Sequence, residues 1–149
     1  MSDSGARRLI SSGSSFERVA GYSRAVVDGR DVHVSGTTGF DYATMTIDDD
    51  VVVQTRQCLA NISAALAQAG CTLDDVVRAR YLLTDAADFE RVAPLFGEAF
   101  ARARPAATAM VVGLVDPRMR IEIEVDARIP AAPSPPAPPA FDWGPTSGI

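Results

Sequence analysis

Residue types that commonly carry chemistry are few in this sequence. His33 is the only histidine, and no acid or nucleophile stands at a recognisable spacing from it, so we interpret it as a strand residue facing solvent or an interface. Cys58 and Cys71 lack the neighbouring Cys or His residues that a zinc site needs, and two cysteines are too few for a disulfide framework. We expect a small buried residue and a turn residue. The sequence therefore predicts no metal site and no cofactor.

Carboxylates are concentrated in the stretch RIEIEVDA, residues 120–127. Side chains alternate along a strand, so its apolar residues share one face and its acids the other. The apolar set is Ile121, Ile123 and Val125, and the acidic set is Glu122, Glu124 and Asp126. Three acids cannot be buried against an apolar core, so this face is solvated or belongs to an assembly interface. Taken alone, Glu122 is best interpreted as a solvated strand residue.

Composition narrows the classes of protein to which the chain can belong. Its 149 residues with 47% apolar content suit one compact domain. The formal net charge of -5 argues against nucleic acid as the main partner, because phosphate binding needs a basic surface. No apolar run has the length of a transmembrane helix, and the N-terminal residues lack a signal-peptide core. We therefore expect a cytoplasmic protein with no nucleic-acid or membrane partner.

The chain divides at Pro130. Residues 130–149, PAAPSPPAPPAFDWGPTSGI, concentrate the prolines and favour neither a helix nor a sheet. We predict a domain over residues 1–129 and a proline-rich tail over residues 130–149. Phe141 and Trp143 leave open a second interpretation, in which the tail docks onto a neighbouring subunit or partner.

The first half of the domain shows clear signals of local structure. In SRAVVDGRDVHVSGTT, Asp28, Gly29 and Arg30 separate two β-rich runs and predict a hairpin. FDYATMTIDDD reads as a polar loop whose last acids, residues 48–50, can cap a helix. A long helix follows, with Gly70 at its C-terminal end. Its apolar face, at helical spacing, comprises Val52, Thr55, Leu59, Ile62, Leu66 and Ala69.

The second half adds a strand at DDVVRARYLLTD, a helix, and two final strands at ATAMVVGLV and RMRIEIEVDARI. The helix is predicted to be capped by the acids of residues 85–88. Its inward side chains are predicted to be Phe89, Val92, Phe96 and Phe100. Pro94 predicts an irregular first turn or a start near Val92. The order is β-ββ-α-β-α-ββ, an α+β fold in which two helices pack on one face of a single sheet.

These segments carry a resemblance to a known family. The succession GYSRAV, DVHVSGTT, QTRQCLANISAALAQAG, DVVRARYLLTDAADFERV, RPAAT and MRIEIEVDA resembles the RidA/YjgF family of enamine and imine deaminases, also called endoribonuclease L-PSP. The resemblance covers residues 21–129. It implies a fold similar to chorismate mutase and a homotrimer that binds a small-molecule substrate in clefts between subunits.

The resemblance also implies functional residues. In the family, an arginine after a Pro-Ala pair binds the substrate carboxylate, and a glutamate on the last strand helps to position or activate the attacking water. Here Pro105 and Ala106 match the pair, so the arginine position is Ala107. Glu122 matches the glutamate. Arginine offers a planar fork of donors that suits a carboxylate, whereas alanine offers none. Of the two implied functional residues, the glutamate is therefore present, whereas the arginine that would bind the carboxylate, called the clamp below, is absent.

Other positions of the implied site are less charged than an anion-binding site would need. Ala93 stands where well-known members carry a polar residue on the second helix. The remaining candidates for substrate binding are Tyr22, Ser35, Gly36, Thr37 and Thr108, with Thr38 as a further hydroxyl. Tyr22 can equally be a packing aromatic. Arg104 adjoins the lost clamp and can replace it, but a surface or inter-subunit salt bridge is the favoured interpretation.

Two functions from different classes follow. The first is hydrolytic deamination of an enamine or imine, with Glu122 positioning or deprotonating water and a substrate that is neutral or bulkier than 2-aminoacrylate. The second is a ligand-binding or scaffold trimer that keeps the fold without the chemistry. RNA cleavage is the weakest alternative, because the chain is acidic and lacks a His or Lys constellation for it.

Overall fold

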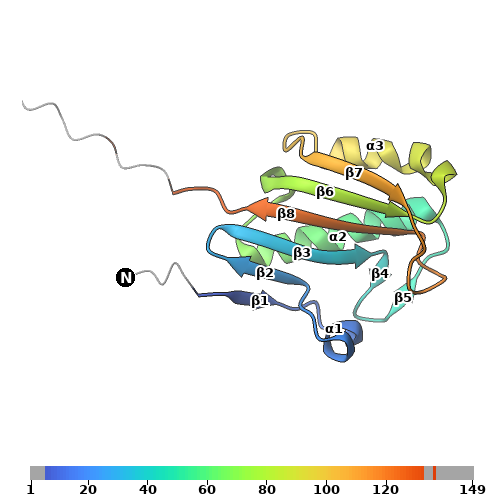
Figure 1. Cartoon of the computed structure of the whole chain (residues 1–149), viewed down its shortest axis with the longest axis horizontal. Helices are drawn as coiled ribbons and strands as arrows, with labels where there is room; N and C mark the ends of the chain where they lie inside the picture. Colours follow the sequence, from blue (N-terminus) through green and yellow to red (C-terminus); the bar gives the residue numbers. More distant parts are fainter. Residues whose placement is uncertain (1–5, 133–135, 137–149) are drawn as a thin grey trace, which may run out of the picture.

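The computed structural model describes residues 6–132 and residue 136 (Figure 1). The strands are β1 Arg8–Ile10, β2 Ala25–Asp28, β3 Asp31–Thr38, β4 Phe40–Asp41, β5 Thr46–Ile47, β6 Val76–Leu83, β7 Ala106–Val111 and β8 Ile121–Arg128. The helices are α1 Ser15–Ala20, α2 Val51–Ala69 and α3 Phe89–Ala99, with 3-10 turns at Leu73–Asp75 and Ala86–Asp88.

Six strands form one sheet in the order β1-β2-β3-β8-β6-β7. All neighbouring pairs are antiparallel except β6 and β7, which are parallel. Figure 1 shows α2 and α3 on the same side of this sheet. The prediction of an α+β fold with two helices on one face of a single sheet is confirmed.

The local signals of the first half explain its elements. The loop between β2 and β3 consists of Gly29 and Arg30, and Gly29 has a φ of 61°, a conformation that glycine adopts without strain. Asp50 caps α2, because its side chain accepts hydrogen bonds from the amides of Val52 and Val53. Gly70 ends α2 with a φ of 83°. The hairpin, the cap and the C-terminal glycine were all predicted.

The core lies between the helices and the sheet. Ile62 and Leu66 of α2 are fully buried and belong to the same cluster as Ile121 and Ile123 of β8. The stacked rings of Tyr81 on β6 and Phe96 on α3 lie 3.9 Å apart between their centroids. Burying these side chains supplies the main stabilisation of the fold.

Helix α3 differs from the prediction in two respects. Phe89 was predicted to point inward, but it is 41% exposed, because α3 begins at this residue and its buried face starts at Val92. A start near Val92 is also wrong. The 3-10 turn Ala86–Asp88 precedes a regular helix that contains Pro94, so the irregular turn lies before the helix.

Two further elements depart from the prediction. The stretch predicted as a polar loop contains the short hairpin of β4 and β5, in which Phe40 pairs with Ile47. Helix α1 was not predicted. Ser14 caps it and Gly21 ends it with a φ of 73°, signals that are easily overlooked around a helix of only six residues.

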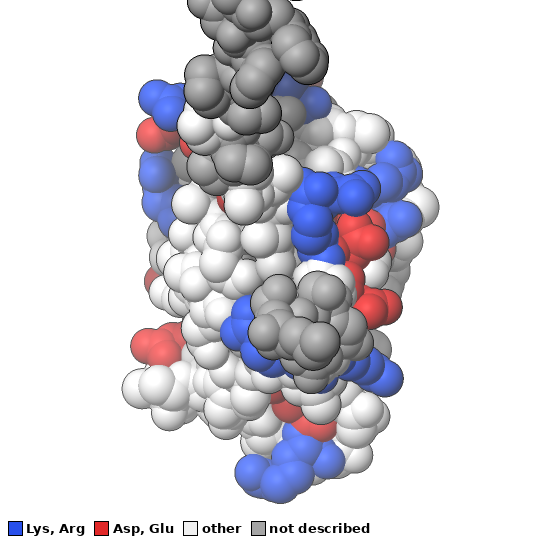
Figure 2. Space-filling model, turned by 90° about the vertical axis from the view of Figure 1, so that its left-hand side faces the viewer, with Lys and Arg blue, Asp and Glu red and all other residues white. Residues whose placement is uncertain are grey.

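The other sheet face carries the acids of β8, as the alternation predicted. Glu124 and Asp126 are partly exposed there, and both lie near Arg80 of β6, with Nη1 3.0 Å from Glu124 Oε1. Figure 2 views a different side, the left-hand end of the molecule in Figure 1, where arginine and acidic side chains also lie next to each other. Exposed pairs of this kind contribute little stability.

The tail predicted from Pro130 onward, with Phe141 and Trp143, lies largely outside the described residues. The division into a domain and a tail therefore stays a prediction. In the described part of the chain, no helix is both long and apolar enough to cross a membrane. The cytoplasmic location also stays a prediction.

Candidate active site

A small cavity beside β8 brings together several of the predicted site residues. Its volume is about 160 Å³. Its lining consists of Phe16, Ala20, Tyr22, Gly36, Thr38, Tyr42, Val115, Met119 and Glu122. Three of the predicted residues, Tyr22, Gly36 and Glu122, are therefore assembled in a single chain. They come from the segment that follows α1, from β3 and from β8.

A bulge in β3 shapes the floor of this cavity. The pairing register of β3 against β8 shifts between Val34 and Thr37. Gly36 lies within the shift, and a Cβ atom placed there would be 2.9 Å from the carboxyl carbon of Glu122 and nearer still to Oε1. Glycine is therefore required at this position for the carboxyl group to lie against the strand.

The environment of Glu122 suits a group that exchanges protons. Burial raises the pKa of this carboxyl, the neighbouring charge of Glu124 raises it further, and Arg24 opposes both effects. A carboxyl group with a raised pKa holds its proton to a higher pH than an ordinary glutamate, which suits a group that both accepts and returns a proton. Its predicted partner in the cavity, Tyr22, is 37% exposed, and burial raises the pKa of its phenol.

Arg24 is a component of the site that the sequence did not reveal. Its side chain is only 2% exposed, and its Nη1 donates to the carbonyl of Gly36 at 2.8 Å and to Oγ1 of Thr37 at 3.0 Å. Its guanidinium carbon lies 4.6 Å from the ring centroid of Tyr42 and 5.6 Å from that of Tyr22. Arg24 thus braces the bulge and both tyrosines of the cavity. The sequence signal was weak, since alternation places Arg24 on the open face.

Two predicted hydroxyls are already engaged inside the fold. Thr37 is fully buried, and its hydroxyl donates to the carbonyl of Ser35 at 2.8 Å. The hydroxyl of Ser35 donates to the carbonyl of Ser23 at 2.6 Å. Thr38 instead lines the cavity, and it pairs with Glu122 across the two strands. Of the three predicted hydroxyls on β3, only that of Thr38 therefore belongs to a residue that lines the cavity.

The structure does not bring the other predicted residues into this cavity. Ala107 lies on β7 and lines a separate cavity of about 300 Å³ together with Arg104, Tyr81 and Phe100. Thr108, one residue further on, accepts a hydrogen bond of 2.9 Å from Nη2 of Arg78. Neither lines the cavity beside Glu122, and the same is true of Ala93 on α3. Within one chain, the acid and the position of the lost clamp are thus parts of different cavities.

The remaining candidates do not form a catalytic centre. His33 is exposed on β3, as predicted, but it has an acidic partner that spacing could not reveal: Nδ1 lies 2.8 Å from Asp126 Oδ1 of β8. Cys58 is buried, as expected, and burial raises the pKa of its thiol. Cys71 is also buried. Over residues 6–132, no three His, Cys, Asp or Glu side chains gather in a way that could hold a metal ion.

This fold and cavity define a class of protein. The family model described as endoribonuclease L-PSP matches residues 12–129. The chain belongs to this family, which is also called RidA/YjgF, and its fold is that of the family's chorismate mutase-like α+β domain.

Individual relatives agree with this assignment. A goat (Capra hircus) protein named 2-iminobutanoate/2-iminopropanoate deaminase is 35% identical over 122 residues, which cover 81% of this chain and 89% of the relative. Rv2704 of Mycobacterium tuberculosis, a solved member of the YjgF/YER057c/UK114 family, is 44% identical with a TM-score of 0.75, covering 83% of this chain and 99% of its own. RidA from the Antarctic bacterium Psychrobacter sp. is 35% identical with a TM-score of 0.69, covering 72% and 88%.

Proposed function

We propose that this protein hydrolyses an enamine or imine to a carbonyl compound and ammonia, with Glu122 as the proton-transfer group. The observation that carries the proposal is the half-buried carboxyl of Glu122, held against Gly36 in a cavity with Tyr22 and Thr38. The relatives named as deaminases of 2-iminobutanoate and 2-iminopropanoate support the class of reaction.

The reaction needs one group that moves protons in both directions. Glu122 takes a proton from water as the water oxygen bonds to the imine carbon, and it passes this proton to the nitrogen as the C=N electron pair moves there, which gives a neutral carbinolamine. The carbinolamine then collapses: Glu122 takes the hydroxyl proton as the C=O bond forms and gives it to nitrogen as the C–N bond breaks, so that ammonia leaves and the carboxylate is restored. A carboxyl whose pKa is raised by burial suits both halves of this sequence.

We propose a neutral substrate, or one bulkier than 2-aminoacrylate. Ala107 offers no charge to a substrate carboxylate. The cavity beside Glu122 is lined largely by apolar and aromatic side chains, among them Phe16, Val115 and Met119. Such a lining stabilises an apolar substituent better than a second charge.

We also propose that the working form is a homotrimer with its sites in clefts between subunits. Edge strand β7 exposes Met110 and Val111, and together with Phe89 these side chains line an apolar cavity at the surface. Such an exposed apolar surface suits contact with another subunit. Light scattering after gel filtration should give about three times the chain mass of 15.7 kDa. A chain that stays monomeric at micromolar concentration would contradict the assembly.

The experiment that tests the function compares the natural protein with Glu122→Gln. Imines are generated in solution from neutral or aromatic amines, with 2-aminoacrylate as the reference, and carbonyl and ammonia release are followed. We expect a loss of about 10²-fold or more in the variant, the usual contribution of general acid–base catalysis. Release at the buffer rate for every substrate would exclude the deaminase function.

A non-catalytic ligand-binding or scaffold trimer is the second candidate function. The observation that favours it is that Ala107 removes the family's charged substrate contact while the fold is intact. If ligands bind in the cleft and Glu122→Gln changes neither turnover nor assembly, this alternative is supported instead.

A further inference from the structure

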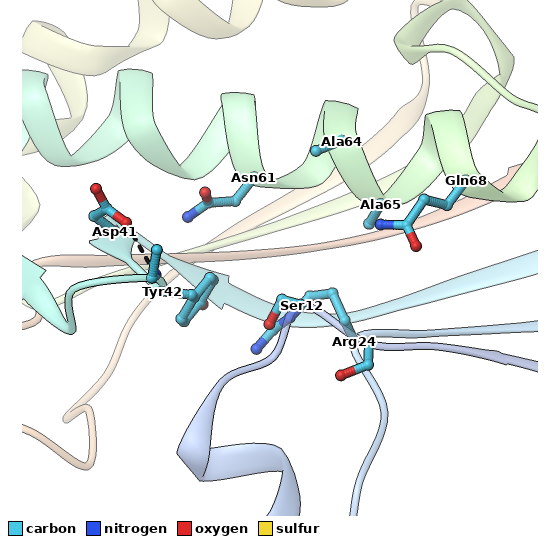
Figure 3. A pocket seen from close by; sticks show the side chains of 10 residues that line it. Ser12, Arg24, Asp41, Tyr42, Asn61, Ala64, Ala65 and Gln68 are labelled. Atoms are coloured by element: carbon cyan, nitrogen blue, oxygen red, sulfur yellow. Dashed lines mark hydrogen bonds between the residues drawn. The ribbon is translucent and has the colours of Figure 1, made fainter.

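A second pocket, larger than the cavity beside Glu122, lies between α2 and the β1–α1 connection. Its volume is about 270 Å³. Its lining consists of Ser11, Ser12, Arg24, Asp41, Tyr42, Ala43, Asn61, Ala64, Ala65 and Gln68. Figure 3 shows Asn61, Ala64, Ala65 and Gln68 projecting from the helix on one side, with Ser12, Arg24 and Tyr42 opposite. Tyr42 also lines the cavity beside Glu122, so the two cavities are neighbours.

The buried Arg24 contributes donors to this pocket that the described residues do not satisfy. A guanidinium group carries five N–H donors. The hydrogen bonds of Arg24 to Gly36 and Thr37 both use Nη1. Nε is fully buried without a hydrogen-bond partner in the described part of the chain, and the nearest carboxylate oxygen, Oε2 of Glu17, is 4.0 Å away. Because Nε has no accessible surface, the donors that remain for a ligand in the pocket are those of Nη2, which donates no hydrogen bond to the described residues.

Glu17 does not accept from this guanidinium, because other donors already hold its carboxylate. Oε2 accepts from the amide of Ser12 at 3.1 Å and from the Ser12 hydroxyl, and Oε1 accepts from the amide of Arg24 at 3.2 Å. Burial raises the pKa of Glu17, but these hydrogen bonds outweigh burial and leave it below the ordinary value. The carboxylate is therefore kept charged and in place, and the guanidinium keeps unused donors.

The other polar side chains of the pocket leave mainly donors as well. The amide nitrogen of Asn61 is used up by the carbonyls of Thr38 and Phe40, and its oxygen accepts from Gln57. The phenol oxygen of Tyr42 accepts from the amide of Thr38 at 3.1 Å, and its other contact, with the Thr38 hydroxyl, is long at 3.4 Å, so a ligand oxygen can compete for the O–H of Tyr42. The walls at Ala43, Ala64 and Ala65 are small and apolar.

From this arrangement we infer that the pocket binds a small monocarboxylate, with its oxygens on the guanidinium of Arg24 and the O–H of Tyr42 and its short apolar body against the alanines of α2. The pocket shares Arg24 and Tyr42 with the surroundings of Glu122, but the inference does not require Glu122 to be catalytic. Arginine is the side chain that best matches a carboxylate, and the contact is strongest in a buried setting.

Asp41 sets the charge that the site accepts. Its Oδ1 accepts from the amide of Ala43 at 3.0 Å, so the carboxylate is held at the rim. A second negative charge on the ligand would lie in the same small pocket as this carboxylate and would be repelled. The site should therefore distinguish a monocarboxylate from a dicarboxylate of similar size.

The test is an NMR titration of the full-length protein with acetate, using acetamide as the neutral isostere and malonate as the dicarboxylate. The Nε–H resonance of Arg24 reports the contact indirectly, because the buried Nε belongs to the same guanidinium group as Nη2. We expect a saturable shift of this resonance with acetate, and at least about tenfold weaker binding of acetamide and malonate, as loss of one charge-assisted contact requires. No acetate-dependent shift, or equal shifts with acetamide, would overturn the inference and assign the donors to water.

Two helix variants separate this pocket from any other carboxylate site. Ala64→Leu fills the pocket from an exposed position of α2, whereas Ala67→Leu adds the same side chain at an exposed position outside the lining. We expect the shift to be lost in the first variant and kept in the second. Equal binding by both would overturn the inference even if acetate binds elsewhere. Neither change disturbs the core, so the test does not depend on a variant that fails to fold.

Discussion

Replacing Gly36 by alanine should separate the position of Glu122 from the stability of the fold. A Cβ atom on residue 36 would be 2.9 Å from the carboxyl carbon of Glu122, whereas carbon atoms in contact are usually at least about 3.5 Å apart. The carboxyl must therefore retreat by on the order of 1 Å. A displacement of this size in a catalytic group costs about 10²-fold in rate.

The stability of the Gly36→Ala variant should change much less than its activity. Gly36 does not have a positive φ, and the atoms it would meet belong to the end of a side chain that can move. Alanine also restricts the unfolded chain, which favours folding by about 0.4–1 kcal/mol where the backbone is compatible. We expect the free energy of unfolding to stay within about 1 kcal/mol of the natural protein.

Three measurements decide this prediction. Urea unfolding gives the stability, imine hydrolysis gives the rate, and a carboxyl ¹³C titration gives the pKa of Glu122. The pKa should fall towards its ordinary value of 4.5 as the carboxyl moves out of its buried position. Gly113→Ala is the matched control, because a Cβ there meets no atom within 4 Å. An unchanged rate and an unchanged pKa in Gly36→Ala would refute the proposed geometry of the site.

The remaining predictions concern substrate charge, pH and packing. Ala107→Arg should raise kcat/KM for 2-aminoacrylate by about tenfold or more, as one restored charged contact would, while neutral imines gain nothing; a uniform change would contradict a lost clamp. In Glu122→Gln, stability at neutral pH should exceed that of the natural protein. The pKa of Glu122 is raised in the folded protein, so the stabilisation that its carboxyl gives the fold is present below pH 4.5 and is lost as the pH rises through the folded pKa. Denaturant curves at pH 4 and pH 7 should therefore show the variant to be more stable than the natural protein only at pH 7. Ile62→Ala should cost about 3 kcal/mol in urea unfolding, because Ile62 is fully buried; a cost below about 1 kcal/mol would contradict its place in the core.

The sequence predicted the elements whose signals are local. The caps of α2 at Asp50 and Gly70, the two-residue loop of the β2–β3 hairpin and the alternation along β8 depend on neighbouring residues. Family resemblance, carried by segments spread along residues 21–129, identified the fold. Phe89 was misplaced because a periodic pattern does not show where a helix begins relative to the sheet it covers.

Only the tertiary structure determined how these elements meet. The last two strands are consecutive in the chain, yet β6 lies between them, and β7 runs parallel to it. The bulge that sets Gly36 against Glu122, the pairing of His33 with Asp126 and the burial of Arg24 all depend on residues far apart in the sequence. Spacing along the chain carries no information about such contacts, because strand order and register are set by the packing of the whole sheet. Through the family resemblance, the sequence predicted an acid at Glu122 and a missing arginine at Ala107, and the structure places these two residues in separate cavities of one chain.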